Sequence, residues 1–196
     1  AGTVDDPGDM MIIGNTTPRY SYSFRIEASW NGFDISAFFQ GVGKRDWYPT
    51  ANKDDIYGAN QFWQLYGYTI PSFITYDFMD DVWSEQNLGG YFPRLRPIQS
   101  YNGGPLGQNN DRYLQSVAYL RFKNLTIGYT LPVLKKYLSK LRIYVSGENL
   151  CYWSPLKKHC KLIDPELAIS SGTYKGGTGT GYTMPRTFSF GVDITF

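Results

Sequence analysis

The alternation of apolar and polar residues from Tyr20 to Trp30 constrains the fold of this chain more than any other feature. Over this stretch the even-numbered positions are Tyr, Tyr, Phe, Ile, Ala and Trp, and the odd-numbered positions are Ser, Arg or Glu. Successive side chains of a strand point to opposite faces of the sheet. The pattern therefore predicts a long strand with one apolar face and one polar face.

Asn31-Gly32 follows this stretch and predicts a two-residue hairpin, because a type I′ turn needs positive φ at both central positions. Such a short loop fixes the register, so we expect Trp30 to pair with Phe33. The expected pairs on the apolar face are Ala28–Ile35, Ile26–Ala37 and Phe24–Phe39, and those on the polar face are Ser29–Asp34, Glu27–Ser36, Arg25–Phe38 and Ser23–Gln40.

Three more strands are predicted from period-two patterns at Tyr119–Leu131, Leu141–Asn149 and Thr187–Phe196. In the first of them, Leu120 and Phe122 have the opposite parity to Leu125 and Ile127. We expect either a bulge near Lys123-Asn124 or a strand that is buried on its second face.

The predicted connections alternate between short and long, with roughly 2, 70, 9 and 32 residues, as in outer-membrane barrels with short periplasmic turns and long external loops. We therefore predict an all-β fold: antiparallel strands of a large transmembrane β-barrel, with extracellular loops at about 1–19, 43–112 and 154–185. Within the long loop, Gln61–Phe78 fits a local helix or a hairpin equally well. A soluble aromatic-rich β-sandwich is the alternative.

Composition excludes several classes of protein. No apolar run exceeds four residues, whereas a helical membrane span needs roughly 20. Aromatic residues make up 17% of the chain, which argues against disorder. The net charge of +2 does not suggest a nucleic-acid or anionic-membrane partner.

Several stretches resemble SusC/RagA-type TonB-dependent transporters. They are Ile13–Asn15, Pro18–Tyr20, Gly32–Asp34, Phe38–Gly41, Trp83-Ser84, Tyr91–Leu95, Tyr119–Pro132, Leu141–Leu150, Asp164–Glu166 and Pro185–Phe196. They span nearly the whole chain in the order of the family. Ala1–Val4 has no feature of a start, so we expect the C-terminal part of a longer receptor.

The resemblance implies a 22-stranded barrel in the cell outer membrane, with a plug domain and a TonB box outside this sequence. It implies a SusD-like surface lipoprotein as lid, and it implies that the terminal aromatic Phe196 is read by the barrel-assembly machinery. Five strands cannot close a membrane barrel alone, since the smallest have about 8.

Few side chains are arranged for chemistry. Asp54-Asp55 and Asp80-Asp81 with Glu85 are carboxylate clusters, but adjacent Asp pairs in a wet loop do not specify the geometry of a glycosidase. The run Gly172–Gly181 lacks the Lys-Ser/Thr end of a phosphate loop and is expected to be a loop tip. His159 is the single histidine, so this chain alone forms no catalytic triad or zinc site. We expect no enzyme and no cofactor.

Two further possibilities concern the loops. Asp5, Asp6 and Asp9 offer oxygens to calcium, although their spacing is not that of an EF-hand. Cys151 and Cys160 could form a disulfide outside the cytosol, or remain two free thiols.

The loop aromatics are the remaining candidates for contact with a ligand or with a lid protein: Trp47, Tyr48, Trp63, Tyr66, Tyr68 and Trp83. Aromatic faces suit both sugar rings and apolar protein patches, but they also suit loops that pack on one another.

The sequence thus predicts import of a nutrient, an oligosaccharide or an oligopeptide, driven by the TonB complex. The alternative is a soluble extracellular glycan-binding β-sandwich module, and an outer-membrane enzyme is a more distant one.

Overall fold

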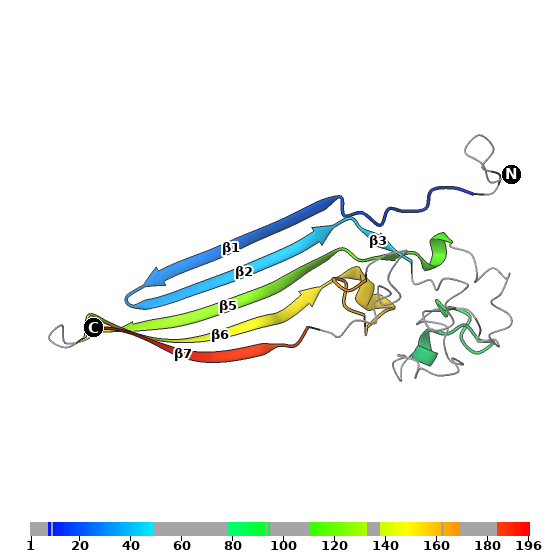
Figure 1. The fold of residues 1–196 in the computed structure, drawn as a ribbon. Coiled ribbons are helices and arrows are strands. Elements are labelled where there is room, and N and C mark those ends of the chain that lie inside the picture. Colours follow the sequence, from blue (N-terminus) through cyan, green and yellow to red (C-terminus); the bar gives the residue numbers. More distant parts are fainter. Residues whose placement is uncertain are drawn as a thin grey trace, which may run out of the picture. The chain divides into compact units, whose positions relative to one another are not determined.

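A computed structural model describes residues 8, 10–48, 78–92, 94, 110–132, 138–161, 163–168 and 184–196. Five long strands form one antiparallel sheet in the order β1-β2-β5-β6-β7, lying side by side in a single layer (Figure 1). They are β1 (Tyr20–Trp30), β2 (Phe33–Gly43), β5 (Tyr119–Leu131), β6 (Lys140–Trp153) and β7 (Thr187–Thr195). The all-β fold class is confirmed, and each long strand pairs with the next long strand of the chain.

The hairpin at Asn31-Gly32 has the predicted register. Trp30 pairs with Phe33, and every pair expected between the two strands is formed. Asn31 and Gly32 have φ values of 47° and 86°, as a type I′ turn requires.

A bulge at Lys123 explains the change of parity in β5. Phe38 pairs with Asn124 but Phe39 pairs with Phe122, so Lys123 is an extra residue relative to β2. The extra residue brings Leu120 and Phe122 to the same face as Leu125 and Ile127. Of the two expectations, the bulge is therefore the one that the structure contains.

The short elements were not predicted from the sequence. β3 (Asp46–Trp47) and β4 (Gln115–Ser116) form a two-stranded sheet, and the described residues include the 3-10 turns η1 (Phe78–Asp81), η4 (Asp111–Tyr113) and η5 (Pro155–Lys158). No helix in the described ranges is both long and apolar enough to cross a membrane.

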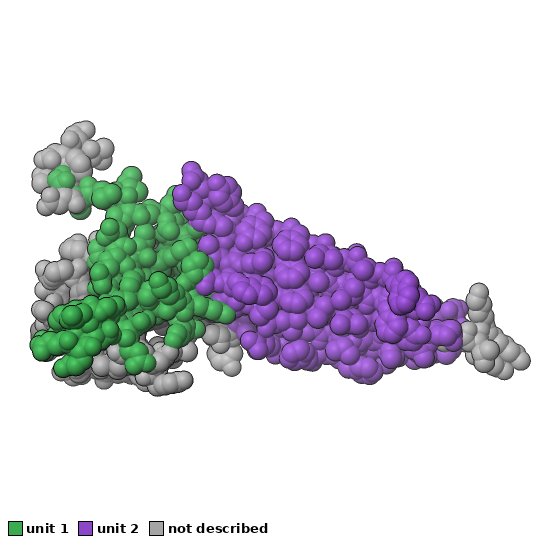
Figure 2. All heavy atoms as spheres, turned by 180° about the vertical axis from the view of Figure 1, so that it is seen from behind, with its two compact units in different colours: residues 1–17, 45–117, 155–181 green, residues 18–44, 118–154, 182–196 purple. Residues whose placement is uncertain are grey.

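The chain divides into two compact units, coloured separately in Figure 2. The sheet unit consists of residues 18–44, 118–154 and 182–196, and the loop unit consists of residues 1–17, 45–117 and 155–181. Among the described residues, the buried core is almost entirely in the loop unit, whereas β1 is exposed along its whole length.

All connections to the loop unit leave the sheet at one end. The pairs Tyr20–Gly43, Val42–Tyr119 and Leu120–Trp153 lie there, and we call it the long-connection end. The hairpin at Asn31-Gly32 and the connection between β5 and β6 lie at the opposite, short-connection end.

Candidate functional site

The sheet unit presents a continuous apolar face. The register places on it Tyr20, Tyr22, Phe24, Ile26, Ala28 and Trp30 of β1; Phe33, Ile35, Ala37 and Phe39 of β2; Leu120, Phe122, Leu125, Ile127, Tyr129 and Leu131 of β5; Leu141, Ile143, Val145, Cys151 and Trp153 of β6; and Phe188, Phe190, Val192 and Ile194 of β7. Many of these side chains are about half exposed, including Ile26 at 57% and Val145 at 52%. An apolar patch of this extent is too large for a surface that faces water.

Aromatic residues border this face at both ends. Tyr20, Tyr22 and Trp153 lie at the long-connection end, and Trp30 and Phe33 lie at the short-connection end. The band between them contains aliphatic residues together with phenylalanines, namely Phe24, Phe39, Phe122, Phe188 and Phe190. An 11-residue strand such as β1, rising about 3.4 Å per residue and tilted by about 40°, covers roughly 25–30 Å. These are the dimensions and the aromatic borders of a lipid-facing barrel wall.

Stacked rings join the strands on this face. The ring centroids of Phe24 and Phe39 are 4.9 Å apart, and those of Phe39 and Phe122 are 4.5 Å apart. Tyr22 crosses over Gly41 and its hydroxyl donates to the carbonyl oxygen of Tyr119 at 3.1 Å. Each such cross-strand contact adds a few tenths of a kcal/mol to about 1 kcal/mol.

The opposite face is polar and carries an ion-pair network that joins β2, β6 and β7. Arg142 of β6 donates through Nε and Nη2 to the carboxylate of Asp34 on β2, at 2.9 and 2.6 Å. Its Nη1 donates to Asp193 Oδ2 on β7 at 3.0 Å. Arg142 is only 18% exposed and lies 4.9 Å from the ring centroid of Tyr144. A bidentate, partly buried guanidinium of this kind fixes the relative positions of the strands.

Gly128 makes this network possible, because it lies on β5 between Asp34 and Arg142. A Cβ atom at Gly128 would lie 2.6 Å from Arg142 Nε and 2.7 Å from Asp34 Oδ1. This network was not predicted from the sequence. The alternation places the three charged residues on the polar faces of their strands, but it does not show that β2 pairs with β5, and this pairing brings them together.

The loop unit is organised by a buried core contributed by four separate stretches of chain. Its members are Trp47, Tyr48, Val82, Phe92, Tyr113, Val117, Leu156, Cys160, Ile163 and Ala168. The core thus joins the beginning of the first long connection to its end and to the second long connection.

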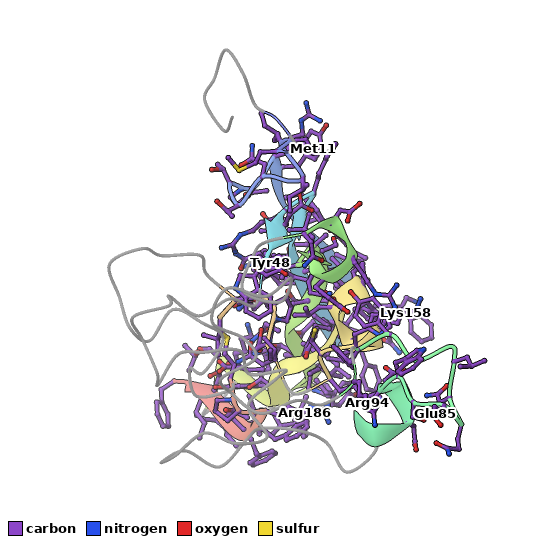
Figure 3. All side chains as sticks on the ribbon, turned by 90° about the vertical axis from the view of Figure 1, so that its right-hand side faces the viewer. Met11, Tyr48, Glu85, Arg94, Lys158 and Arg186 are labelled. Carbon is purple, nitrogen blue, oxygen red and sulfur yellow. The ribbon has the colours of Figure 1, made fainter. Side chains whose placement is uncertain are left out.

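The structure places the predicted loop aromatics unequally. Trp47 and Tyr48 are 2% and 9% exposed and belong to the core of the loop unit; Figure 3 labels Tyr48. Burial raises the pKa of the Tyr48 hydroxyl, which receives a hydrogen bond from Asn110. Trp83 is half-buried. For Trp47 and Tyr48, loop-on-loop packing is the alternative that this placement favours.

Some candidate residues lie outside the described residues: Trp63, Tyr66, Tyr68, Asp54, Asp55, the calcium candidates Asp5, Asp6 and Asp9, and Gly172–Gly181. The undecided segment Gln61–Phe78 also falls there except for its last residue. These expectations stay as they were stated.

His159 joins the two long connections. Its ring stacks on Tyr91 with centroids 3.6 Å apart, and its Nδ1 lies 3.3 Å from Asp81 Oδ2. The Tyr91 hydroxyl donates to the carbonyl oxygen of Arg112 at 2.5 Å and accepts from Gln115 Nε2 at 2.7 Å. Burial raises the pKa of the Tyr91 hydroxyl, and the hydrogen bond from Gln115 partly offsets this. Asp81 is therefore engaged in packing the loops together.

Cys151 and Cys160 are both free, so the structure does not contain the disulfide that the sequence allowed. Cys151 is a strand residue opposite Phe122 on the apolar face of the sheet. Cys160 is buried in the loop core, where its thiol donates to Gln115 Oε1 at 3.6 Å. Burial raises the pKa of the Cys160 thiol, which keeps it protonated.

Comparison with known proteins supports the interpretation of the sheet as part of a transmembrane barrel wall. No family model matches the chain. A TonB-dependent receptor P3 of Formosa agariphila is 28% identical over 198 aligned positions, which cover 96% of this chain and 17% of that receptor. A solved structure of the RagAB peptide transporter matches with a TM-score of 0.60 and 22% identity, over 94% of this chain and 18% of that one. The closed-closed state of the RagAB peptide importer matches with a TM-score of 0.52 and 20% identity, over 94% of this chain and 18% of that one.

The apolar face, its aromatic residues and the polar opposite face are those of the wall of a transmembrane β-barrel. The comparisons agree with the resemblance carried by the strand motifs: the chain is similar in sequence to part of a TonB-dependent receptor and similar in fold to part of the RagAB transporter. It spans about a sixth of the length of the relatives it matches.

Proposed function

We propose that the whole protein imports a nutrient across the outer membrane, driven by the TonB complex. The observation that carries the proposal is the sheet with one lipid-compatible face and one polar face, from which every long connection leaves at the same end. In this proposal the apolar face holds the barrel in outer-membrane lipid and the polar face lines the lumen. TonB acts through regions outside this sequence, and import needs no covalent chemistry from this segment.

The substrate and the partner follow from the resemblance and the relatives. RagAB is described as a peptide importer, which supports an oligopeptide as cargo. The family resemblance keeps an oligosaccharide as the other candidate, and it supports a SusD-like surface lipoprotein as lid. The long connections are the segments that would contact the substrate and the lipoprotein.

Uptake by intact cells tests the proposal. Cells that express the full-length protein should accumulate a labelled oligopeptide or oligosaccharide mixture, and deletion of TonB should abolish the accumulation. Equal accumulation with and without TonB would refute energised import. Recovery of the protein in the soluble fraction without detergent would instead favour the soluble glycan-binding module.

We further propose that the connections at 43–112 and 154–185 lie on the extracellular side. Their common exit from one end of the sheet supports this topology. The variants Lys53→Cys and Lys175→Cys should react with a membrane-impermeant maleimide on intact cells. Protection of both sites until the outer membrane is broken would reverse the topology.

A further inference from the structure

Two consecutive residues of the connection between β6 and β7, His159 and Cys160, make separate contacts with the connection between β2 and β5. They follow the 3-10 turn η5, whose last residue, Lys158, is labelled in Figure 3. The backbone N–H of Cys160 donates to the carbonyl oxygen of Leu156 at 2.9 Å, which fixes the two residues at the end of this turn. All of these residues belong to the loop unit, so both contacts form within one compact unit.

The first contact is made by the ring of His159. It stacks on the ring of Tyr91 with centroids 3.6 Å apart and an interplanar angle of 9°, and it meets Phe92 edge-on at 6.0 Å. Its Nδ1 lies 3.3 Å from Asp81 Oδ2, and its side chain is only 15% exposed. A ring held between an aromatic partner and a carboxylate has little freedom to shift, so His159 has a defined position relative to residues 81–92.

The second contact is made by Cys160 through Gln115. The Cys160 thiol donates to Gln115 Oε1 at 3.6 Å, and Nε2 of the same amide donates to the Tyr91 hydroxyl at 2.7 Å and to the carbonyl oxygen of Tyr113 at 3.0 Å. Gln115 is 6% exposed. Leaving a buried amide without partners is costly, so Gln115 ties Cys160 and Tyr91 to one position.

Both contacts converge on a segment whose two ends are held together by its own backbone. The N–H of Trp83 donates to the carbonyl oxygen of Phe92 at 2.8 Å, and the N–H of Phe92 donates to the carbonyl oxygen of Asp81 at 2.9 Å. Asp81 and Tyr91, which His159 contacts, therefore lie together at the base of one closed loop. A movement of His159 away from either of them would disturb the other.

We propose that five residues, Asp81, Tyr91, Gln115, His159 and Cys160, form a clamp that makes the two long connections move as one body during import. Residues that share buried contacts open together as one cooperative unit, whereas loops without such contacts open separately. This inference rests on the proposed function for its role in import. The clamp itself is a property of the folded protein and is tested without any substrate.

Hydrogen exchange of the purified full-length protein in detergent tests the clamp. His159→Ala removes the stacked ring and the contact with Asp81, and the control Lys158→Ala removes an exposed side chain next to it. We expect His159→Ala to speed exchange of the amides of Trp83 and Phe92 by about 10-fold or more, although they belong to the other connection, and the control to change it by less than about 2-fold. Faster exchange confined to residues 156–161 would show that the connections open independently and would overturn the inference.

Cross-linking on cells tests the role of the clamp in import. Tyr91→Cys/His159→Cys, with Cys151→Ala and Cys160→Ser to remove the native thiols, is joined by a short bifunctional thiol reagent. Uptake is measured with the labelled oligopeptide or oligosaccharide mixture that the wild-type protein accumulates. The joined protein should import faster than the unjoined one, because the link restores the clamp. Import that is normal without the link and blocked by it would show that the connections must separate, and would refute the inference.

The two experiments fail separately from the proposed function. Absence of TonB-dependent uptake by the wild-type protein would refute the importer, whereas the exchange of Trp83 and Phe92 decides the clamp in either case. Heat-modifiable gel mobility shows whether each variant has folded. Where His159→Ala does not insert, His159→Phe replaces it, since it keeps a ring on Tyr91 and removes the contact with Asp81. Its acceleration of exchange should be smaller but should occur at the same amides.

Discussion

At the scale of single residues, glycine positions decide which side chains can cross the sheet. Gly128 leaves the space through which Arg142 reaches Asp34, and Gly41 lies under the ring of Tyr22. A side chain at Gly128 would occupy this space and disturb the polar network without deleting any charge. The effect of a methyl group at Gly128 therefore measures how much the network contributes.

Gly128→Ala should lower the free energy of unfolding of the full-length barrel by about 1–3 kcal/mol, because the new Cβ would collide with Arg142 and Asp34. Urea unfolding in detergent measures the change. Gly43→Ala is the matched control, since a Cβ there meets its nearest atom at 3.4 Å. An equal effect of both substitutions would show that loss of strand glycines, and not the network, explains the result.

A second residue-scale prediction concerns the reactivity of Cys160. Burial raises its pKa, so at pH 8 a smaller fraction is thiolate than in a free cysteine. Iodoacetamide should therefore modify Cys160 at least ten times more slowly in the folded protein than in urea, and the rate should rise as the pH rises. Mass spectrometry of the modified peptide measures it. Equally fast modification in both states would contradict the burial of this thiol.

At the scale of elements, each long strand has an apolar side and a polar side. The bulge at Lys123 keeps the apolar residues of β5 on one face of the sheet along the whole strand. Ile26→Arg should cost about 2–4 kcal/mol if the residue lies near the midplane of the bilayer, because the charge enters hydrocarbon. Ser146→Arg is the control. Ser146 lies on the polar face, next to Gly147, which is in the same cross-strand row as Ile26. The folded fraction in liposomes measures both effects. A larger loss for Ser146→Arg than for Ile26→Arg would show that the polar face, and not the apolar face, contacts lipid.

At the scale of the whole molecule, the sheet is part of a wall that must close with strands outside this chain. Open sheet edges in hydrocarbon leave backbone groups unsatisfied at several kcal/mol each. We therefore expect residues at the end of β7 to act in the assembly of the barrel. Phe196 follows β7 and is 87% exposed.

Deleting Phe196 from the full-length protein should reduce insertion into the outer membrane far more than it changes uptake per inserted molecule. The resemblance to the family motivates this expectation, since it implies that the assembly machinery reads this aromatic. Heat-modifiable gel mobility gives the inserted fraction, and uptake is normalised to it. Normal insertion with lost uptake would assign Phe196 to transport instead.

The sequence by itself determined the local features of the sheet. The period-two patterns located the five long strands, and Asn31-Gly32 set the register of the first hairpin down to each pair. These features are encoded by neighbouring residues, because the strand period and the turn conformation depend on adjacent dihedral angles and on the side-chain pattern.

Only the tertiary structure decided the rest. The parity of Tyr119–Phe122 allowed two interpretations until the pairing of β2 with β5 showed the bulge. The Asp34–Arg142–Asp193 network and the loop core each join residues that are far apart in the chain. Such contacts depend on which strands and loops meet in space, and a pattern of neighbouring residues does not contain that information.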